Sequence, residues 1–237
     1  MQEELLIDVV TAPRFRSAAA TDIGRVREVN QDSFLERTDV GIWAVADGLG
    51  GHSHGEVASR MVCEALADVV PGATLDDAVN AARERVGEVN DQLAQAALRP
   101  VDPVQSGSTV VALLVRGTRC AILWAGDSRA YRWRTGRLEQ LTVDHSLAEE
   151  EGIASTAITR AVGGEPLLLL DLHRDRIQAG DRFLLCSDGL TRIVPDRQIR
   201  EWMESDDIRH AVDGLVTATL EAGAPDNVTA LIVEAFV

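Results

Sequence analysis

Two long stretches of the chain carry apolar residues at helical spacing. In the first, which begins at Glu56, apolar side chains recur every three or four residues until Pro71 and Gly72 stop the pattern. The second follows Thr74, and its apolar stripe consists of Leu75, Ala78, Val79, Ala82, Val86, Val89 and Leu93. We expect two amphipathic helices, each with one face buried in a core.

Short apolar or β-branched segments lie on either side of this helix pair. They predict strands at residues 32–37, 41–46, 109–116, 119–124, 130–134, 181–186 and 227–236. Residues 1–16 predict an extended lead-in interrupted by Pro13, and residues 134–137 (RTGR) predict a hairpin turn. Residues 145–163 are polar and irregular, whereas residues 196–204 and 208–221 predict helices, the second stopped by Gly223. Because strands come in runs and do not alternate with helices, the pattern predicts an α+β layered fold.

Composition narrows the class of protein. The chain has 237 residues, of which 46% are hydrophobic, which suits one globular domain. Its formal net charge is -15, so we expect neither nucleic acid nor an anionic membrane as a partner. The three cysteines form no CxxC pair, the first ten residues are acidic, and no apolar run is long enough to span a bilayer. We expect a cytoplasmic protein, and a monomer.

Four aspartates stand where apolar strands begin or end: Asp47, Asp127, Asp188 and Asp226. Taken singly, each is a typical turn residue. As a set, they would converge at one rim of a sheet, where like charges raise one another's pKa unless a cation is present. Carboxylate oxygens favour Mg²⁺ or Mn²⁺. Gly48 follows Asp47 and would let the backbone approach an ion closely.

The chain resembles the PP2C-type (PPM) metal-dependent protein serine/threonine phosphatases over nearly its whole length. The matching segments, in order, are TDIGRVREVNQDS (21–33), VADGLGGH (45–52) with GEVAS (55–59), GSTVV (107–111), WAGDSRAYRWR (124–134), LTVDHS (141–146), LCSDGL (185–190) and PDNVT (225–229). The resemblance implies one phosphatase domain over residues 1–237. Its expected fold is a four-layer αββα sandwich of two antiparallel sheets flanked by helix pairs, with a short flap around 145–163.

The resemblance also implies a metal centre of two or three Mn²⁺ or Mg²⁺ ions. Asp47 would bridge two metals, with the carbonyl of Gly48 on the second, while Asp188 and Asp226 would complete the first site. Asp127 would hold a third metal together with Asp188.

Three further residues are assigned by the resemblance to the substrate and the attacking water. Arg27 would bind the substrate phosphate, Asp32 would orient a metal-bound water, and His52 would donate a proton to the leaving alkoxide. Water activated by the metals would attack phosphorus in line, without a covalent phosphoenzyme. The expected partners are proteins phosphorylated on serine or threonine, with a cognate Ser/Thr kinase as antagonist.

Two features depart from the family pattern. Position 31 is Gln where most relatives have Glu, which puts the affinity of the second metal in doubt. The segment after LTVDHS is short, and by analogy it resembles the flap of phosphatases associated with bacterial type VI secretion.

Two alternatives stay open at this stage. Residues 186–192 (CSDGLTR) fit C-x-x-G-x-x-R, the pattern of a cysteine-based phosphatase that would use Cys186, although Asp188 would then lie inside a phosphate-binding loop. The other alternative is a non-catalytic phosphoprotein-sensing domain with a degenerate site. Loss of a metal-binding aspartate would favour it, and none is lost.

Overall fold

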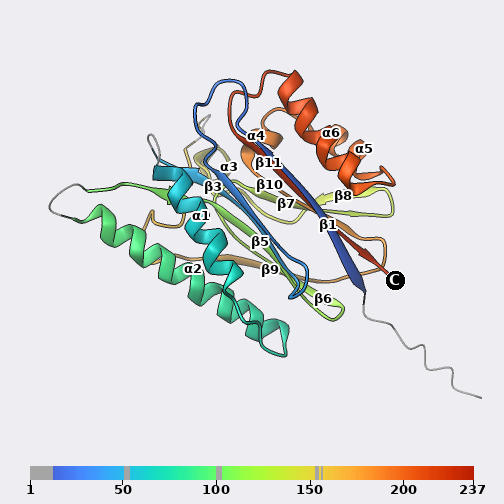
Figure 1. The fold of residues 1–237 in the computed structure, drawn as a ribbon, viewed down its shortest axis with the longest axis horizontal. Helices are drawn as coiled ribbons and strands as arrows, with labels where there is room; N and C mark the ends of the chain where they lie inside the picture. The colour runs from blue at the N-terminus through green and yellow to red at the C-terminus, as the bar shows by residue number, and fades with distance from the viewer. Residues whose placement is uncertain (1–12, 51–53, 100–102, 153–154, 156) are drawn as a thin grey trace, which may run out of the picture.

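The computed structural model describes residues 13–50, 54–99, 103–152, 155 and 157–237. Two antiparallel sheets lie face to face between two pairs of helices (Figure 1). This is the α+β, four-layer αββα sandwich expected from the sequence. None of the helices in the described ranges is long and apolar enough to cross a bilayer.

The first sheet has the strand order β1-β11-β10-β7-β8, in which every pair is antiparallel. Its strands are β1 (Arg14–Asp22), β11 (Val228–Phe236), β10 (Arg182–Cys186), β7 (Arg129–Arg134) and β8 (Arg137–Gln140). The second sheet has the antiparallel order β2-β3-β5-β6-β9, and the two-residue β4 pairs with the end of β3. Its strands are β2 (Asp32–Arg37), β3 (Ile42–Leu49), β4 (Gly107–Ser108), β5 (Val110–Arg116), β6 (Arg119–Ala125) and β9 (Asp171–Arg176).

The helices cover the outer faces of the two sheets. Helices α1 (His54–Ala67) and α2 (Leu75–Ala97) pack on the second sheet, and α5 (Asp196–Met203) and α6 (Ile208–Glu221) pack on the first. Thr74 caps α2, because its hydroxyl accepts from the backbone N–H of Asp77 while the Asp77 carboxylate accepts from that of Thr74. There are two further short helices in the described residues. Helix α3 (Leu147–Glu151) begins after Ser146, and α4 (Asp188–Thr191) begins after Ser187, directly behind β10.

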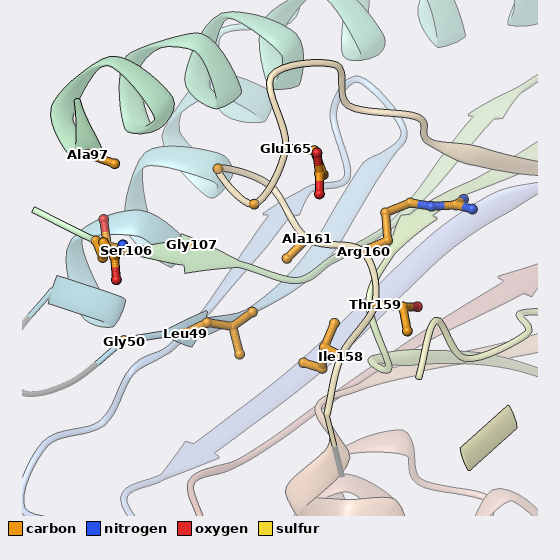
Figure 2. A pocket seen from close by; sticks show the side chains of 13 residues that line it. Leu49, Gly50, Ala97, Ser106, Gly107, Ile158, Thr159, Arg160, Ala161 and Glu165 are labelled. Carbon is orange, nitrogen blue, oxygen red and sulfur yellow. The ribbon is translucent and has the colours of Figure 1, made fainter. Parts of the chain in front are cut away.

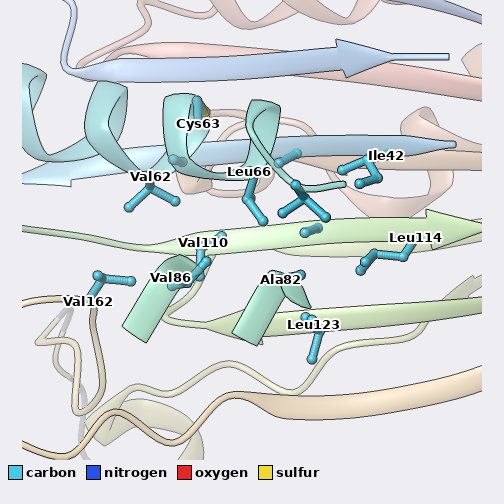
Figure 3. Packing of buried hydrophobic residues seen from close by; sticks show 14 of the residues in the cluster. Ile42, Val62, Cys63, Leu66, Ala82, Val86, Val110, Leu114, Leu123 and Val162 are labelled. Carbon is cyan, nitrogen blue, oxygen red and sulfur yellow. The ribbon is translucent and has the colours of Figure 1, made fainter. Parts of the chain in front are cut away.

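Three apolar clusters separate the four layers. Alternate residues of β3 belong to different clusters: Ile42 and Ala44 face α1 and α2, whereas Trp43 and Val45 face the other sheet. Figure 3 shows the helix-side cluster, where Val62 and Leu66 of α1 and Val86 of α2 meet strand residues. Val162, from the predicted irregular segment, is fully buried in the same cluster and anchors that segment to the core.

The structure corrects several details of the expected elements. The expected lead-in at 1–16 falls partly outside the described residues, and strand β1 continues six residues beyond it to Asp22. Strand β9 was not expected, because DLHRDR is charged and lies at a sheet edge, where apolar alternation is not required. The hairpin turn at 134–137 is confirmed, since Thr135 and Gly136 both have positive φ, 46° and 83°.

The segment expected to be wholly irregular contains some regular structure. Ser146 caps α3 through its hydroxyl, and an isolated antiparallel bridge joins Ser146 to Ile158. A second bridge joins Ser108 to Val162. The expected flap therefore returns to the body of the protein along the end of the second sheet.

Candidate metal centre

The carboxylates singled out from the sequence stand at strand ends on one rim of the sandwich. Asp32 begins β2 and pairs directly with Asp47 of β3. Asp127 lies in the turn between β6 and β7, Asp188 begins α4 after β10, and Asp226 precedes β11. The register brings these turns together, because Cys186 of β10 pairs with Arg129 of β7 and with Ala230 of β11.

Asp32 is buried, and only one of its two carboxylate oxygens accepts hydrogen bonds from described residues. Its Oδ2 accepts hydrogen bonds of 2.7 Å from the hydroxyls of Ser187 and Thr229, which join the two sheets at this rim. Its Oδ1 is buried and has no hydrogen-bond partner among the described residues. Burial raises the pKa of Asp32 to about 7. The hydrogen bonds from the two hydroxyls lower this pKa in part, and the charge of Asp188 raises it further.

Asp47 is held through its backbone. Its N–H donates to Thr109 Oγ1 at 2.9 Å, and its carbonyl accepts from the N–H of Thr109 at 2.8 Å. Thr109 Oγ1 is also 2.7 Å from the hydroxyl of Ser128, which follows Asp127. Burial and the neighbouring carboxylates, Asp32 foremost, raise the pKa of Asp47 well above its ordinary value. Thr109 thus links the turns that carry two of the aspartates.

Asp127 and Asp188 form a close acidic pair. The charge of Asp188 contributes to the raised pKa values of both Asp127 and Asp47. Burial and then Asp188 raise the pKa of Asp127 to about 7, and burial also raises the pKa of Asp188. The Oδ1 of Asp127 is buried without a hydrogen-bond partner in the described ranges. Arg192 contacts both carboxylates.

Asp226 is paired with Arg27. The guanidinium donates from Nε and Nη2 to the two carboxylate oxygens, each at 2.8 Å. This pairing raises the pKa of Arg27, although 54% of its side chain is exposed. Asn227 fixes the loop that carries Arg27, because its Nδ2 donates to the carbonyls of Ile23 and Val29.

Gly48 and Gln31 lie beside Asp47 and Asp32. A Cβ on Gly48 would lie 2.2 Å from the carbonyl oxygen of Gly55, so close packing against α1 already requires glycine here. The N–H of Gly48 donates to the carbonyl of Gln31 at 3.0 Å. The side-chain amide of Gln31 donates to the carbonyl of Gly50 at 3.3 Å, which directs it toward the segment after Gly48. His52, the expected proton donor, lies outside the described residues.

The donor set suits a hard divalent cation. Asp32 and Asp127 are buried carboxylates with raised pKa values, and each has one oxygen without a hydrogen-bond partner among the described residues. A bound cation would stabilise their ionised forms and could be coordinated by these oxygens. Within the described ranges, no three Asp, Glu, His or Cys side chains are already arranged as one set of metal ligands. Arg27 and Arg192 instead neutralise Asp226 and Asp188.

Two cavities adjoin this rim. One, of about 510 Å³, lies between Leu49 and Gly50 at the end of β3, residues 105–107 and the returning flap segment at 158–165 (Figure 2). Figure 2 shows Arg160 pointing away from this space, and its Nη1 donates to Asp171 at 2.6 Å. The other cavity, of about 140 Å³, is lined by Asp127, Asp188 and Arg192 and by residues of the flap segment. None of the candidate aspartates lines the larger space, whereas Asp127 and Asp188 line the smaller one.

Cys186 is poorly placed to act as a nucleophile. Its side chain is fully buried at the end of β10, and its thiol contacts the carbonyl of Arg129. Burial raises the pKa of this thiol to about 12, whereas a nucleophilic cysteine needs a lowered pKa. Residues 188–191 of the C-x-x-G-x-x-R match form α4. The burial of Cys186 and the helix at 188–191 therefore disfavour the cysteine-based alternative.

Several residues that hold the site were missed from the sequence. They are Thr109, Ser187, Arg192, Asn227 and Thr229. Each stands within four residues of a predicted aspartate or inside a quoted motif, and that proximity was the available signal. Apart from the Arg192–Asp188 pair, which is local, their bonding partners are distant in sequence, so only the fold identifies these contacts.

The chain is similar to several known protein phosphatases. A family model described as Protein phosphatase 2C matches residues 24–230. The structure of PppA, described as a key regulatory component of T6SS in Pseudomonas aeruginosa, aligns with a TM-score of 0.90 and 40% identity over 95% of this chain and 100% of that one. The catalytic domain of the serine/threonine protein phosphatase PstP in complex with two manganese ions aligns with a TM-score of 0.84 and 35% identity over 94% of this chain and 99% of that one.

Sequence relatives carry similar names. The serine/threonine phosphatase stp of Listeria welshimeri is 34% identical over 235 residues, which cover 90% of this chain and 93% of that protein. PstP of Mycobacterium tuberculosis is 37% identical over 242 residues and 92% of this chain, but the match spans only 45% of its length. The match to the family model, these identities and the shared architecture show that this chain belongs to the protein phosphatase 2C family.

Proposed function

We propose that this chain hydrolyses phosphoserine and phosphothreonine on proteins in a Mn²⁺- or Mg²⁺-dependent reaction. The observation that carries the proposal is the rim of buried carboxylates with raised pKa values and unpartnered oxygens, beside an exposed arginine. Asp47, Gly48, Asp188 and Asp226 are the candidate ligands of two ions, and Asp127 together with Asp188 is the candidate pair for a third.

Bound Mn²⁺ or Mg²⁺ would supply the positive charge that lowers the pKa of a water molecule and neutralises phosphoryl oxygens. Two ions are supported by the PstP structure, whose own description names two manganese ions.

The side chains around the carboxylates have separable tasks in this proposal. Arg27 orients the substrate phosphate. Asp226 accepts from its Nε and Nη2, and no other described residue accepts from the guanidinium, so the remaining N–H groups can donate to phosphate oxygens. Asp32 positions the attacking water through Oδ1, since Ser187 and Thr229 already hold Oδ2. His52 is the proposed proton donor to the leaving alkoxide.

The biological setting is proposed by analogy with the relatives. The expected antagonist is a cognate Ser/Thr kinase in a bacterial cytoplasm. PppA, which shares 40% of its residues with this chain, is described as a regulatory component of T6SS, and this supports a role in type VI secretion control.

Phosphopeptide hydrolysis tests the proposed specificity. With Mn²⁺ present, the protein should release phosphate from phosphothreonine and phosphoserine peptides and leave a phosphotyrosine peptide of the same sequence largely intact. Asp188→Asn should abolish release, whereas Asp206→Asn, at an exposed position after α5, should not change it. Binding of the phosphothreonine peptide without turnover would instead favour the phosphoprotein-sensing alternative.

A further inference from the structure

Arg192 lies directly over the acidic pair formed by Asp127 and Asp188. It follows α4 with helical dihedral angles, φ -71° and ψ -22°, so it is placed one helical turn after Asp188 on the same face. Its Nη2 is 2.5 Å from Asp188 Oδ2 and 3.3 Å from Asp127 Oδ2. One guanidinium nitrogen therefore contacts both carboxylates.

The pair that Arg192 contacts is the pair that would hold a third divalent ion. Both carboxylates are well shielded from solvent, with 8% of the Asp127 side chain and 10% of the Asp188 side chain exposed. Two buried carboxylates at close range need a positive charge to remain ionised together. The guanidinium supplies this charge permanently, because arginine does not lose its proton in proteins.

Space does not exclude an ion from this position. The cavity of about 140 Å³ beside Asp127, Asp188 and Arg192 extends to Ser146 and Ser155 of the flap segment. A volume of that size accommodates an ion with several waters, since a water molecule takes about 30 Å³. What opposes an ion here is the positive charge already in contact with the same oxygens.

We propose that Arg192 is a tethered cation that takes the place of the third divalent ion, so that this chain binds two Mn²⁺ ions and not three. The inference rests on the metal-dependent function proposed above. The contact of Arg192 with Asp188 is made to Oδ2, and in this proposal Oδ1 of Asp188 would serve the divalent ion shared with Asp47.

Counting bound Mn²⁺ tests this role without measuring activity. Metal-free protein is dialysed against a series of Mn²⁺ concentrations, and the bound ions per chain are obtained from the free Mn²⁺ signal in electron paramagnetic resonance. The unaltered chain and Arg192→Lys should bind two ions at saturation, because both keep the positive charge. Arg192→Ala should bind three. Arg200→Ala controls for the loss of a surface charge, because Arg200 is an arginine of α5 that pairs with Glu204. This variant should bind two ions.

Two further variants make the outcome decisive. Arg192→Gln keeps much of the side-chain length and hydrogen bonding, and it should also bind three ions if Arg192→Ala does not fold. Adding Asp127→Asn to either neutral variant should return the count to two.

Three ions on the unaltered chain, or two on both neutral variants, would overturn the role of Arg192 while leaving the metal-dependent function intact. No ion on any of the proteins would refute the metal-dependent function itself, and the role of Arg192 with it.

Discussion

The buried carboxyl group of Asp32 predicts that the metal-free protein loses stability as the pH rises. Its pKa in the folded chain is about 7, against an ordinary value of 3.8 that we assign to the unfolded chain. Between these values the folded state holds a proton that the unfolded state has released, so the stabilisation is complete below pH 4 and is lost as the pH rises through 7. Integration of this difference from pH 5 to pH 7 gives a loss of about 2 kcal/mol for this group.

The variant Asp32→Asn isolates this contribution. An asparagine oxygen still accepts the hydrogen bonds from Ser187 and Thr229, but the side chain does not titrate. Urea unfolding followed by tryptophan fluorescence in EDTA, at pH 5 and pH 7, gives the free energy of unfolding of both proteins. The unaltered chain should lose about 2 kcal/mol more than Asp32→Asn over this interval.

A divalent cation should reverse the effect, because it favours the ionised carboxylates of the rim. With saturating Mn²⁺, the extra loss in the unaltered chain should shrink or disappear. Asp206→Asn, an exposed carboxylate, should behave as the unaltered chain does. Equal pH dependence in the unaltered chain and Asp32→Asn without metal would refute the assignment of a raised pKa to Asp32.

The other predictions concern turnover and metal affinity. Asp47→Ala and Asp188→Ala should each lower kcat at least ~10³-fold, because each removes a proposed ligand beside the activated water; a loss below tenfold in a folded protein would count against their role. Cys186→Ser should leave kcat within about tenfold, since the thiol is buried with a raised pKa; complete inactivation of the folded variant would restore the cysteine mechanism. Gln31→Glu places a charge beside the second proposed site, worth on the order of 1 kcal/mol, and should tighten Mn²⁺ activation several-fold with little change in kcat. Superimposable Mn²⁺ titrations would mean that position 31 does not tune this site.

The layered α+β class could be predicted because apolar periodicity was strong where both faces are buried, whereas the four-layer order was implied by the family resemblance. Strand β3 is apolar at consecutive positions, since its alternate residues enter two different cores. Strand β1 was cut short because its middle consists of alanines, which carry little strand propensity and become buried only when α6 covers one face of the strand and the second sheet covers the other. Among the described strands, β9 pairs with β6 alone, and its charged sequence shows no apolar alternation from which a strand could be predicted.

The acidic residues of the site could be predicted from the sequence, but the hydroxyl and amide side chains that hold them could not. Aspartates at strand ends and the family motifs placed the carboxylates on one rim, and the structure brings their turns together there. The link from Thr229 to Asp32 joins residues 197 positions apart, and it depends on how the two sheets are packed. The contact from Arg192 to Asp127 likewise depends on the pairing of β7 with β10.

Removal and restoration of metal is the most direct measurement of the central claim. Protein freed of metal by exhaustive chelation should release no phosphate from a phosphothreonine peptide, and readdition of Mn²⁺ or Mg²⁺ should restore turnover as the ions bind. Full activity that survives exhaustive chelation would contradict the account.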